Sequence, residues 1–344
     1  MNFTEFYNKE GNSILVRFRE FQPKDAESIV NLIRDEYGDK YHTPELYDKD
    51  IIIQRYREGK IIFHVAELTT GEIVACLNMK RSLPQEKCYG MGTGIVLKAY
   101  RKYHIFEPLI KYVMDQIRKL QGASAIHALL VMYHDITQHS IDRLGLKPCG
   151  FIFSMVLADQ FTHSFQKDDN PKYHFILTAC KVSKTDAGTL YLPAEHENIS
   201  SKIYDSCGVE FEIKIGGADL SGKSVVNVED SPIHQNCSIY IDSAGADLFE
   251  RITEIESQHQ QSFQTFNVFL NINDEKSIAA YENLKSLGYF FAGFKPLAGE
   301  HELMIMHNPK IVSIHFDSLL AIEHFAFLKD YVNQCYESRC KIED

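Results

Sequence analysis

The segment that decides the fold is Gly90-Met91-Gly92-Thr93-Gly94-Ile95-Val96, followed by Leu97-Lys98-Ala99-Tyr100-Arg101-Lys102-Tyr103-His104-Ile105-Phe106. The first part predicts a β-strand, and its glycines recur at period two, which predicts that all three lie on one bare face. The second part predicts a basic turn. Behind the turn, apolar residues recur at intervals of three and four, and Pro108 suits the first turn of a helix. The periodic positions are Leu109, Ile110, Val113, Met114, Ile117 and Leu120.

A bare strand that leads through a basic turn into a helix N-terminus suits an extended ligand that carries phosphates. The backbone N–H groups at a helix start and the helix dipole both attract anions. The alternative is an ordinary basic turn that caps a helix.

The length and net charge of the chain limit the classes of protein to which it can belong. A chain of 344 residues predicts two domains of roughly 150 to 180 residues. The net charge of −11 argues against nucleic-acid binding, which depends on clustered Lys and Arg. No apolar run approaches the roughly 18 residues that span a bilayer, so we expect no membrane partner.

The cysteines and histidines show no metal pattern. The eight cysteines include no CxxC pair and follow no secretory leader, so we expect reduced thiols in the cytoplasm. The fifteen histidines form no HxxxH pair and no cluster with cysteine, so we expect no bound metal.

Alternating and apolar segments outline the secondary structure. They predict strands at 14–21, 61–68, 73–79, 90–96, 126–133, 149–157 and 173–182, with helices at 23–37, 50–58, behind the basic turn and at 134–144. Thr69-Thr70-Gly71-Glu72 predicts a hairpin, so the three strands between 61 and 96 are expected to be antiparallel neighbours. A polar loop around 168–171 joins the last two strands, and the polar run 183–188 is the best linker candidate.

The second half repeats the first in outline. Leu144-Gly145, four residues and Gly150-Phe151 recur as Leu287-Gly288, four residues and Gly293-Phe294. Each copy follows a strand and a helix, at 266–272 and 277–287 in the second half, where an earlier strand at 238–242 leads into another helix. Chance could match so few residues, but the matched order of elements favours a duplication. A helix at about 316–336 is expected to end the chain.

This order of elements resembles the GNAT superfamily of N-acyltransferases. The family's acyl-CoA pyrophosphate motif is Arg or Gln, two residues, Gly, one residue, and Gly or Ala. Arg101 matches it, whereas His104 and Phe106 replace the glycine and the small residue. His134, ten residues and Gly145-Leu146 resemble the later motif, in which an Asn-led helix ends at Gly-Phe.

The resemblance implies an α/β (α+β) fold with two GNAT-like domains, each a mixed, mostly antiparallel sheet flanked by helices. Residues 1–182 would form the acyl-CoA-binding domain, and residues 183–344 a degenerate GNAT-like domain. The implied cofactor-binding residues are Ile95, Val96, Leu97, Arg101, Lys102, Tyr103, His104, Ile105 and Phe106.

The corresponding turn of the second copy is Asp242-Ser243-Ala244-Gly245-Ala246-Asp247, which has no basic residue. Carboxylates at that helix start are expected to occupy the N–H groups and to repel a pyrophosphate. We therefore expect the second copy to have lost the cofactor.

Acyl transfer from a thioester to an amine requires a base, a stabilised oxyanion and a proton for the leaving thiolate. The family's usual tyrosine acid falls on Ile141, and residues 90–96 contain no carboxylate. Backbone N–H groups near 95–97 are the oxyanion donors in relatives. The catalytic candidates are His134, as base or orienting donor, and Tyr133, with His139 further along; a capping histidine and a core tyrosine are the alternatives.

The expected function is therefore transfer of an acetyl or other acyl group from acyl-CoA to a primary amine, by direct attack in a ternary complex. The acceptor is a small molecule or a protein, and a homodimer is one oligomeric state open to the chain. The alternative is a non-catalytic acyl-CoA-binding sensor. A third function, an aminoacyl-tRNA-dependent transferase, is disfavoured by the acidic charge.

Overall fold

The computed structural model describes residues 3–81, 87–157, 172–183, 186–259, 263, 265–310 and 313–339. Contacts divide them into two compact units, the first up to Ala128 and the second from Leu129 onward. Both units combine mixed, mostly antiparallel sheets with flanking helices, which confirms the predicted fold class. The predicted boundary at residue 182 separates the two copies of the expected duplication, and it stays a prediction.

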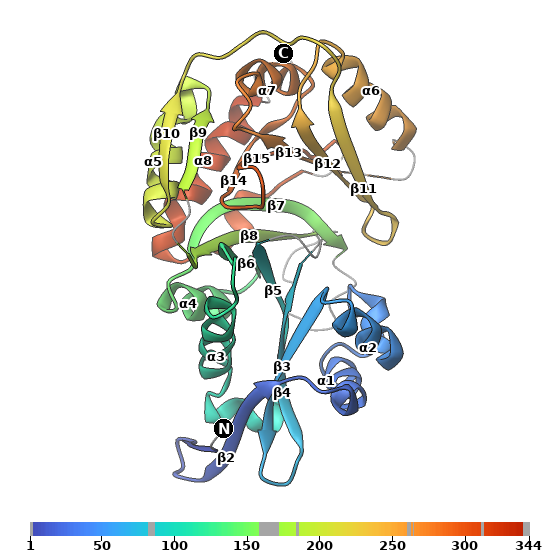
Figure 1. The fold of residues 1–344 in the computed structure, drawn as a ribbon, viewed down its shortest axis with the longest axis vertical. Helices are drawn as coiled ribbons and strands as arrows, with labels where there is room; N and C mark the ends of the chain where they lie inside the picture. The colour runs from blue at the N-terminus through green and yellow to red at the C-terminus, as the bar shows by residue number, and fades with distance from the viewer. Residues whose placement is uncertain are drawn as a thin grey trace. The chain divides into compact units, whose positions relative to one another are not determined.

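The first unit is built on a mostly antiparallel sheet. Its strands lie side by side in chain order: β1 (Thr4–Tyr7), β2 (Ser13–Glu20), β3 (Ile61–Leu68), β4 (Ile73–Lys80), β5 (Cys88–Val96) and β6 (Ala125–Val131), of which the last runs on into the second unit. β3, β4 and β5 are antiparallel neighbours as predicted, and β5 and β6 are parallel. Helices α1 (Ala26–Tyr37) and α2 (Lys49–Arg57) lie on one side of the strands, and α3 (Phe106–Arg118) lies on the other (Figure 1).

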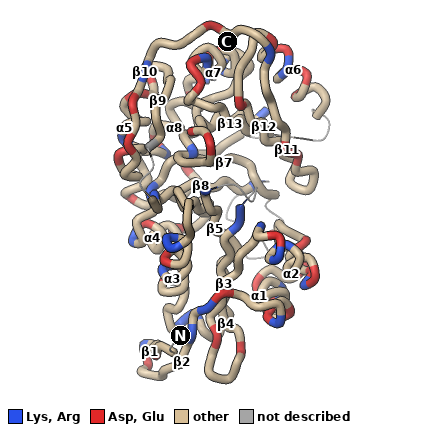
Figure 2. The backbone as a smooth tube through the Cα atoms, viewed as in Figure 1, with Lys and Arg blue, Asp and Glu red and all other residues tan. Residues whose placement is uncertain are grey.

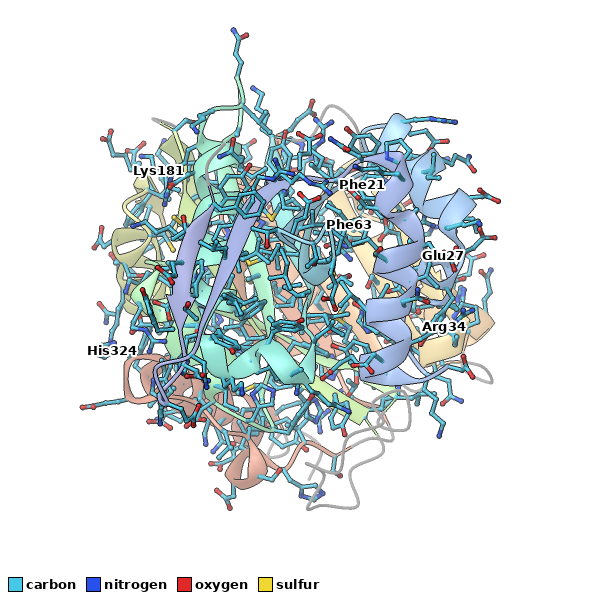
Figure 3. All side chains as sticks on the ribbon, turned by 90° about the horizontal axis from the view of Figure 1, so that it is seen from below. Phe21, Glu27, Arg34, Phe63, Lys181 and His324 are labelled. Atoms are coloured by element: carbon cyan, nitrogen blue, oxygen red, sulfur yellow. The ribbon has the colours of Figure 1, made fainter. Side chains whose placement is uncertain are left out.

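Helix α1 is amphipathic, and its apolar side packs against the sheet. Ile29 and Ile33 are fully buried, and Phe21 and Phe63 lie in the same core cluster with ring centroids 6.2 Å apart. Each such side chain contributes about 1.5 to 3 kcal/mol of burial energy. Glu27 lies on the outer side of the helix (Figure 3), and acidic and basic residues are interspersed on α1 and α2 (Figure 2).

A buried ion cluster joins β2, β3 and the start of α1. Arg19 donates to both carboxylate oxygens of Asp25, at 2.6 and 3.0 Å, and to Glu67 Oε2 at 2.9 Å. All three side chains are buried. The cluster fixes the chain entry into α1, because a charge left here without its partner would be strongly unfavourable.

The second unit has more elements. The strands are β7 (Lys147–Leu157), β8 (Lys172–Lys181), β9 (Asp186–Tyr191), β10 (Glu210–Lys214), β11 (Val225–Ser231), β12 (Asn236–Ser243), β13 (Thr265–Asn271), β14 (Phe290–Lys295) and β15 (Leu303–Asn308). The helices are α4 (Ile136–Arg143), α5 (Glu197–Ser206), α6 (Leu248–His259), α7 (Ser277–Ser286) and α8 (Glu323–Arg339). The sheet order is β8-β7-β14-β15-β13-β12-β11, with β9 and β10 as a separate pair, and α8 packs on β14 and β7.

Three expectations about this half meet different outcomes. The linker prediction is wrong for residues 186–188, which begin β9, because β9 pairs with β10 and Asn273 Nδ2 donates to the Ala187 and Thr189 carbonyl oxygens. Residues 184–185 and the polar loop at 168–171 lie outside the described residues. The last helix begins at Glu323 rather than near 316, where Phe316–Ser318 forms a separate 3-10 turn.

The repeated Gly-Phe pair has a structural meaning. Gly150 of β7 pairs directly with Gly293 of β14 in an antiparallel register. A Cβ atom on Gly150 would lie 2.8 Å from the Phe294 carbonyl oxygen, and one on Gly293 would lie 2.3 Å from the Gly150 Cα atom. Only glycine lets these two strands approach so closely. The two copies of the motif therefore meet each other in the sheet.

Candidate functional site

Strand β5 carries a bulge in the middle of the predicted ligand strand. Cys76 of β4 pairs with Ile95 and Asn78 pairs with Gly92. Thr93 and Gly94 therefore share one partner position, and Thr93 adopts a φ of 45°. Such bulges redirect a strand and end its regular pairing.

Buried polar groups hold the bulge in place. The Thr93 hydroxyl accepts from Asn78 Nδ2 at 3.0 Å and hydrogen-bonds to the Tyr41 hydroxyl at 2.9 Å. Tyr41 and Asn78 are both almost fully buried. The Oδ1 atom of Asn78 has no hydrogen-bond partner among the described residues, which leaves a buried acceptor beside β5.

The prediction that the three glycines share one bare face is wrong, because the bulge reverses the last of them. A Cβ atom on Gly90 or Gly92 would meet the side chain of Lys80 or Asn78, on the face of β4 where Cys76 joins the α1 core cluster. A Cβ atom on Gly94 would meet Leu77 and the ring of Phe106, which belongs to α3.

Phe106 explains why residue 94 is glycine. Its ring would lie 2.7 Å from a Cβ atom on Gly94, so even alanine does not fit without a shift. The ring thus covers part of the strand that the sequence predicts to be bare. Phe106 stands where the GNAT motif has a small residue.

The basic turn retains the backbone geometry of a glycine loop. Lys98–Tyr103 form a 3-10 turn, and His104 has a φ of 55°, in the left-handed region. That conformation costs a non-glycine residue about 1 kcal/mol. Helix α3 then begins with Ile105 at its N-cap, and no side chain in the described part of the chain caps this start, which leaves backbone N–H groups that an anion can bind.

Arg101 is engaged by the protein itself. Its guanidinium forms an ion pair with Glu36 of α1, and Nε donates to the Val96 carbonyl oxygen at 3.0 Å. Its side chain is 46% exposed. Glu36 neutralises the positive charge of Arg101, which in the GNAT motif binds the pyrophosphate. Glu107, in the first turn of α3, adds a negative charge that disfavours an anion at this helix start.

The remaining predicted cofactor residues divide between core and surface. Ile95, Val96 and Ile105 are buried, and the Leu97 N–H donates to the Val74 carbonyl oxygen at 2.9 Å. The Leu97 N–H therefore already donates a hydrogen bond within the protein. Lys102 lies on the turn with its ammonium 5.6 Å from the Tyr103 ring centroid.

Tyr133 and His134 belong to the second unit, between β6 and α4, whereas the basic turn belongs to the first. Tyr133 packs on Tyr173, with ring centroids 4.7 Å apart, and meets the His134 ring edge-on at 4.9 Å. Burial lowers the pKa of His134, so its imidazole is neutral at pH 7. His139 is exposed beside Asp135, at 3.6 Å, and Ile141 is buried in the core.

The corresponding turn of the second copy is filled by the protein's own chain. The Gly245 N–H donates to Ser224 Oγ at 2.9 Å, and the Ala246 N–H donates to the Gly222 carbonyl oxygen at 3.0 Å. Asp247 accepts from the Ser224 N–H at 2.7 Å. The expectation that carboxylates occupy the N–H groups is therefore wrong for Gly245 and Ala246, whose N–H groups donate to segment 222–224.

Sequence reasoning missed Tyr41 and Asn78. The signal for Asn78 is a lone amide in the apolar strand at 73–79, where a polar residue requires partners. Tyr41 lies in a loop that carries no such pattern. No group of histidine, cysteine and acidic residues suited to a metal occurs in the described part of the chain, and none of its helices is long and apolar enough to cross a membrane.

Comparisons with known proteins give remote likenesses. No protein-family model matches, and no curated protein matches. A chimera of the Vibrio cholerae spermidine N-acetyltransferase aligns at 12% identity over 49% of this chain and 97% of its own, with a TM-score of 0.40. A ribosomal-protein-S5-alanine acetyltransferase from Vibrio fischeri aligns at 12% identity over 53% of this chain and 98% of its own, with a TM-score of 0.39.

Proposed function

We propose that the chain is an acyl-CoA-dependent N-acyltransferase of the GNAT type, built as a tandem of one cofactor-binding half and one degenerate half. It transfers an acetyl or other acyl group to a primary amine. The observation that carries the proposal is the bulged strand β5, which leads through a glycine-like loop at His104 into the uncapped start of α3.

These features suit the parts of acyl-CoA. The described ladder between β5 and β6 pairs Cys88–Met91 with Ala125–Ala128 and stops before the bulge. Beyond it, β5 offers a strand edge to the pantetheine arm, and the start of α3 suits the pyrophosphate. Segment 222–224 fills the matching turn of the second half, so we assign the cofactor to the first half.

In the reaction, the amine nitrogen attacks the thioester carbonyl carbon, the C–S bond breaks, and the leaving thiolate takes up the proton that the amine loses. A lysine-like amine is neutral in about one molecule in a thousand at pH 7. A base is therefore useful, and we assign that role to the neutral imidazole of His134, with Tyr133 as a proton donor.

The acceptor amine would lie on the α1 side of β4 and β5. Asn78 Oδ1 is buried there without a partner among the described residues, and an amine N–H can satisfy it. Tyr41 completes this polar spot through Thr93. Neither residue selects one particular amine.

Calorimetric titration with acetyl-, malonyl- and long-chain CoA tests the cofactor assignment. Arg101→Glu should weaken binding at least tenfold, and Glu36→Gln, which releases Arg101, should strengthen it. Asp247→Ala should leave the affinity unchanged, because Asp247 binds segment 222–224. Loss of binding in Asp247→Ala, with unchanged binding in Arg101→Glu, would show that the cofactor binds in the second half and would contradict this assignment.

A non-catalytic acyl-CoA sensor is the second candidate. The packing of Phe106 on Gly94, the ion pair of Arg101 with Glu36, and the apolar Ile141 favour it. Binding without thiol release, across a panel of small amines and lysine peptides, would select the sensor.

A further inference from the structure

Strand β11 ends the sheet of the second unit at an open edge. It pairs antiparallel with β12 from Val225 to Ser231, and no strand in the described part of the chain pairs with its other side (Figure 1). Five of its seven residues are exposed, and the exposed fractions of Val225 and Val228 are 53% and 37%. An edge strand of this kind presents unpaired backbone N–H and C=O groups, with which another strand can pair.

The first half of the chain covers the strand in the corresponding position. β4 precedes β5 as β11 precedes β12, and both pairs are antiparallel. On its other side β4 pairs with β3, and the sheet continues through β2 to the four-residue strand β1. In the second half the strand before β11 is β10, which pairs with β9 instead. Among the described residues, the second half therefore has no strand where β3 lies in the first.

Two of the polar side chains of β11 already have partners in the second unit. Asp230 forms an ion pair with His259 of α6 at 2.9 Å, and Asn227 Nδ2 donates to Asp242 Oδ2 of β12 at 2.8 Å. Glu229 is different, because it is exposed and forms no hydrogen bond or ion pair with a described residue. Lys223, which lies just before the strand, is likewise exposed and forms neither kind of bond with the residues that the structure describes.

These two charges make the edge complementary to itself. Lys223 and Glu229 lie equally far from Val226 along the chain and, in an extended segment, on the same face. If two β11 strands pair antiparallel about a twofold axis at Val226, Lys223 of each copy lies opposite Glu229 of the other. Opposite charges in directly opposed positions stabilise an antiparallel pair, and like charges destabilise it. The same register sets the exposed Val225 opposite Asn227 of the other copy.

We propose that β11 pairs antiparallel with β11 of a second copy of this chain, with Lys223 opposite Glu229 on both sides of the twofold axis. The sheet of the second unit then continues into the second copy, and the interface uses the same patch on both copies. The pairing uses no residue to which we assign a role in acyl transfer, so a failure of either proposal leaves the other unaffected.

Sedimentation equilibrium of the full chain, from low micromolar to submillimolar concentration, tests the proposal. One short strand pair is a small interface, so we expect a weak, reversible equilibrium between monomer and dimer. Lys223→Glu and Glu229→Lys should each raise the dissociation constant of the dimer at least tenfold, because each change sets two pairs of like charges across the axis. Both variants should keep the thermal midpoint within a few degrees of wild type, since neither side chain has a bond to lose.

An equimolar mixture of the two variants tests the register. The chain with Lys223→Glu presents two acids at the edge and the chain with Glu229→Lys presents two lysines, so every opposed pair in a mixed dimer has opposite signs. With one variant fluorescently labelled, the mixed dimer should form at least tenfold more tightly than either variant alone. Glu282→Lys is the matched control, because it reverses an exposed acid of α7 away from β11, and it should leave dimerisation unchanged.

Three results would each overturn the proposal. A wild-type chain that stays monomeric throughout would show that Glu229 and Asp230 protect this edge from strand pairing. Unchanged dimerisation in both folded single variants would place the interface elsewhere on the molecule. A mixture that associates no better than its components would exclude the antiparallel register.

Discussion

At the scale of single residues, the bulge in β5 depends on the close packing of Phe106 against Gly94, which we call the fitted pair. Phe106 occupies the space where Gly94 would carry a side chain, and Leu77 lies 3.2 Å from the same point. Gly90, on the other side of the strand, would place a Cβ atom at an ordinary contact distance of 3.6 Å from Lys80. Packing therefore requires glycine at position 94, whereas these contacts do not require it at position 90.

Gly94→Ala should therefore lower the free energy of unfolding by about 1 to 3 kcal/mol, because it overpacks a filled site. Adding Phe106→Leu should recover part of the loss. Urea unfolding of the single and double variants measures both effects. Gly90→Ala is the control and should cost less than 1 kcal/mol; an equal loss at both positions would contradict the fitted pair.

The surroundings of Glu302 lead to a second prediction, about the pH dependence of the free energy of unfolding. Its buried carboxylate accepts from the Leu297 N–H and from the Tyr204 hydroxyl, and burial raises its pKa to about 7. The folded state thus holds the proton more tightly than the unfolded state, so the stability from this group is present below about pH 4.5 and is lost as the pH rises through 7.

Glu302→Gln should remove that dependence. Relative to wild type, the variant should gain stability between pH 5 and pH 8, by on the order of 2 to 3 kcal/mol. Guanidinium unfolding at both pH values gives the difference. A stability difference that does not change with pH would show that Glu302 does not titrate in this range.

At the scale of elements, the sequence predicted the regular parts of the molecule well. Strands 61–68 and 73–79 alternate or run apolar between clear turn residues, and their predicted positions match β3 and β4 closely. It failed where pairing comes from distant partners. Strand β10 was missed although Glu210–Lys214 alternates exposed polar and half-buried apolar residues, a pattern typical of a strand. Strand β9 depends on pairing with β10 and on Asn273.

The candidate site shows the same limit. Arg101 could be identified from a motif, but its partner Glu36 lies on α1, 65 residues away in the sequence. The bulge at Thr93 leaves no local pattern, because Asn78 and Tyr41 stabilise it from other elements. Spacing along one chain does not predict such contacts.

The ion cluster between β2, β3 and α1 can be tested at this scale. Arg19→Met should lower the free energy of unfolding by about 3 kcal/mol or more, since it leaves Asp25 and Glu67 buried without that partner. Arg17→Met is the matched control: Arg17 also contacts Glu67 but is 34% exposed, and its loss should cost about 1 kcal/mol or less. Chemical unfolding of both variants decides whether burial sets the difference.

At the scale of the whole molecule, the second half parallels the first in its elements but not in its turn. The series β12, α6, β13, α7, β14, β15 follows the same order as β5, α3, β6, α4, β7, β8. Segment 222–224 fills one turn, whereas among the described residues no side chain caps the start of α3. On this asymmetry we base the proposal of a single acyl-CoA site, in the first half of the chain.

Acyl transfer is tested most directly by measuring the release of free CoA thiol together with the mass of the acceptor. The purified chain is incubated with acetyl-CoA and a panel of primary amines at pH 8. We expect amine-dependent thiol release, an acceptor heavier by one acetyl group, and at least a tenfold loss of rate in Arg101→Glu at subsaturating acetyl-CoA. Binding of acetyl-CoA with no amine-dependent thiol release and no mass change for any amine would contradict it.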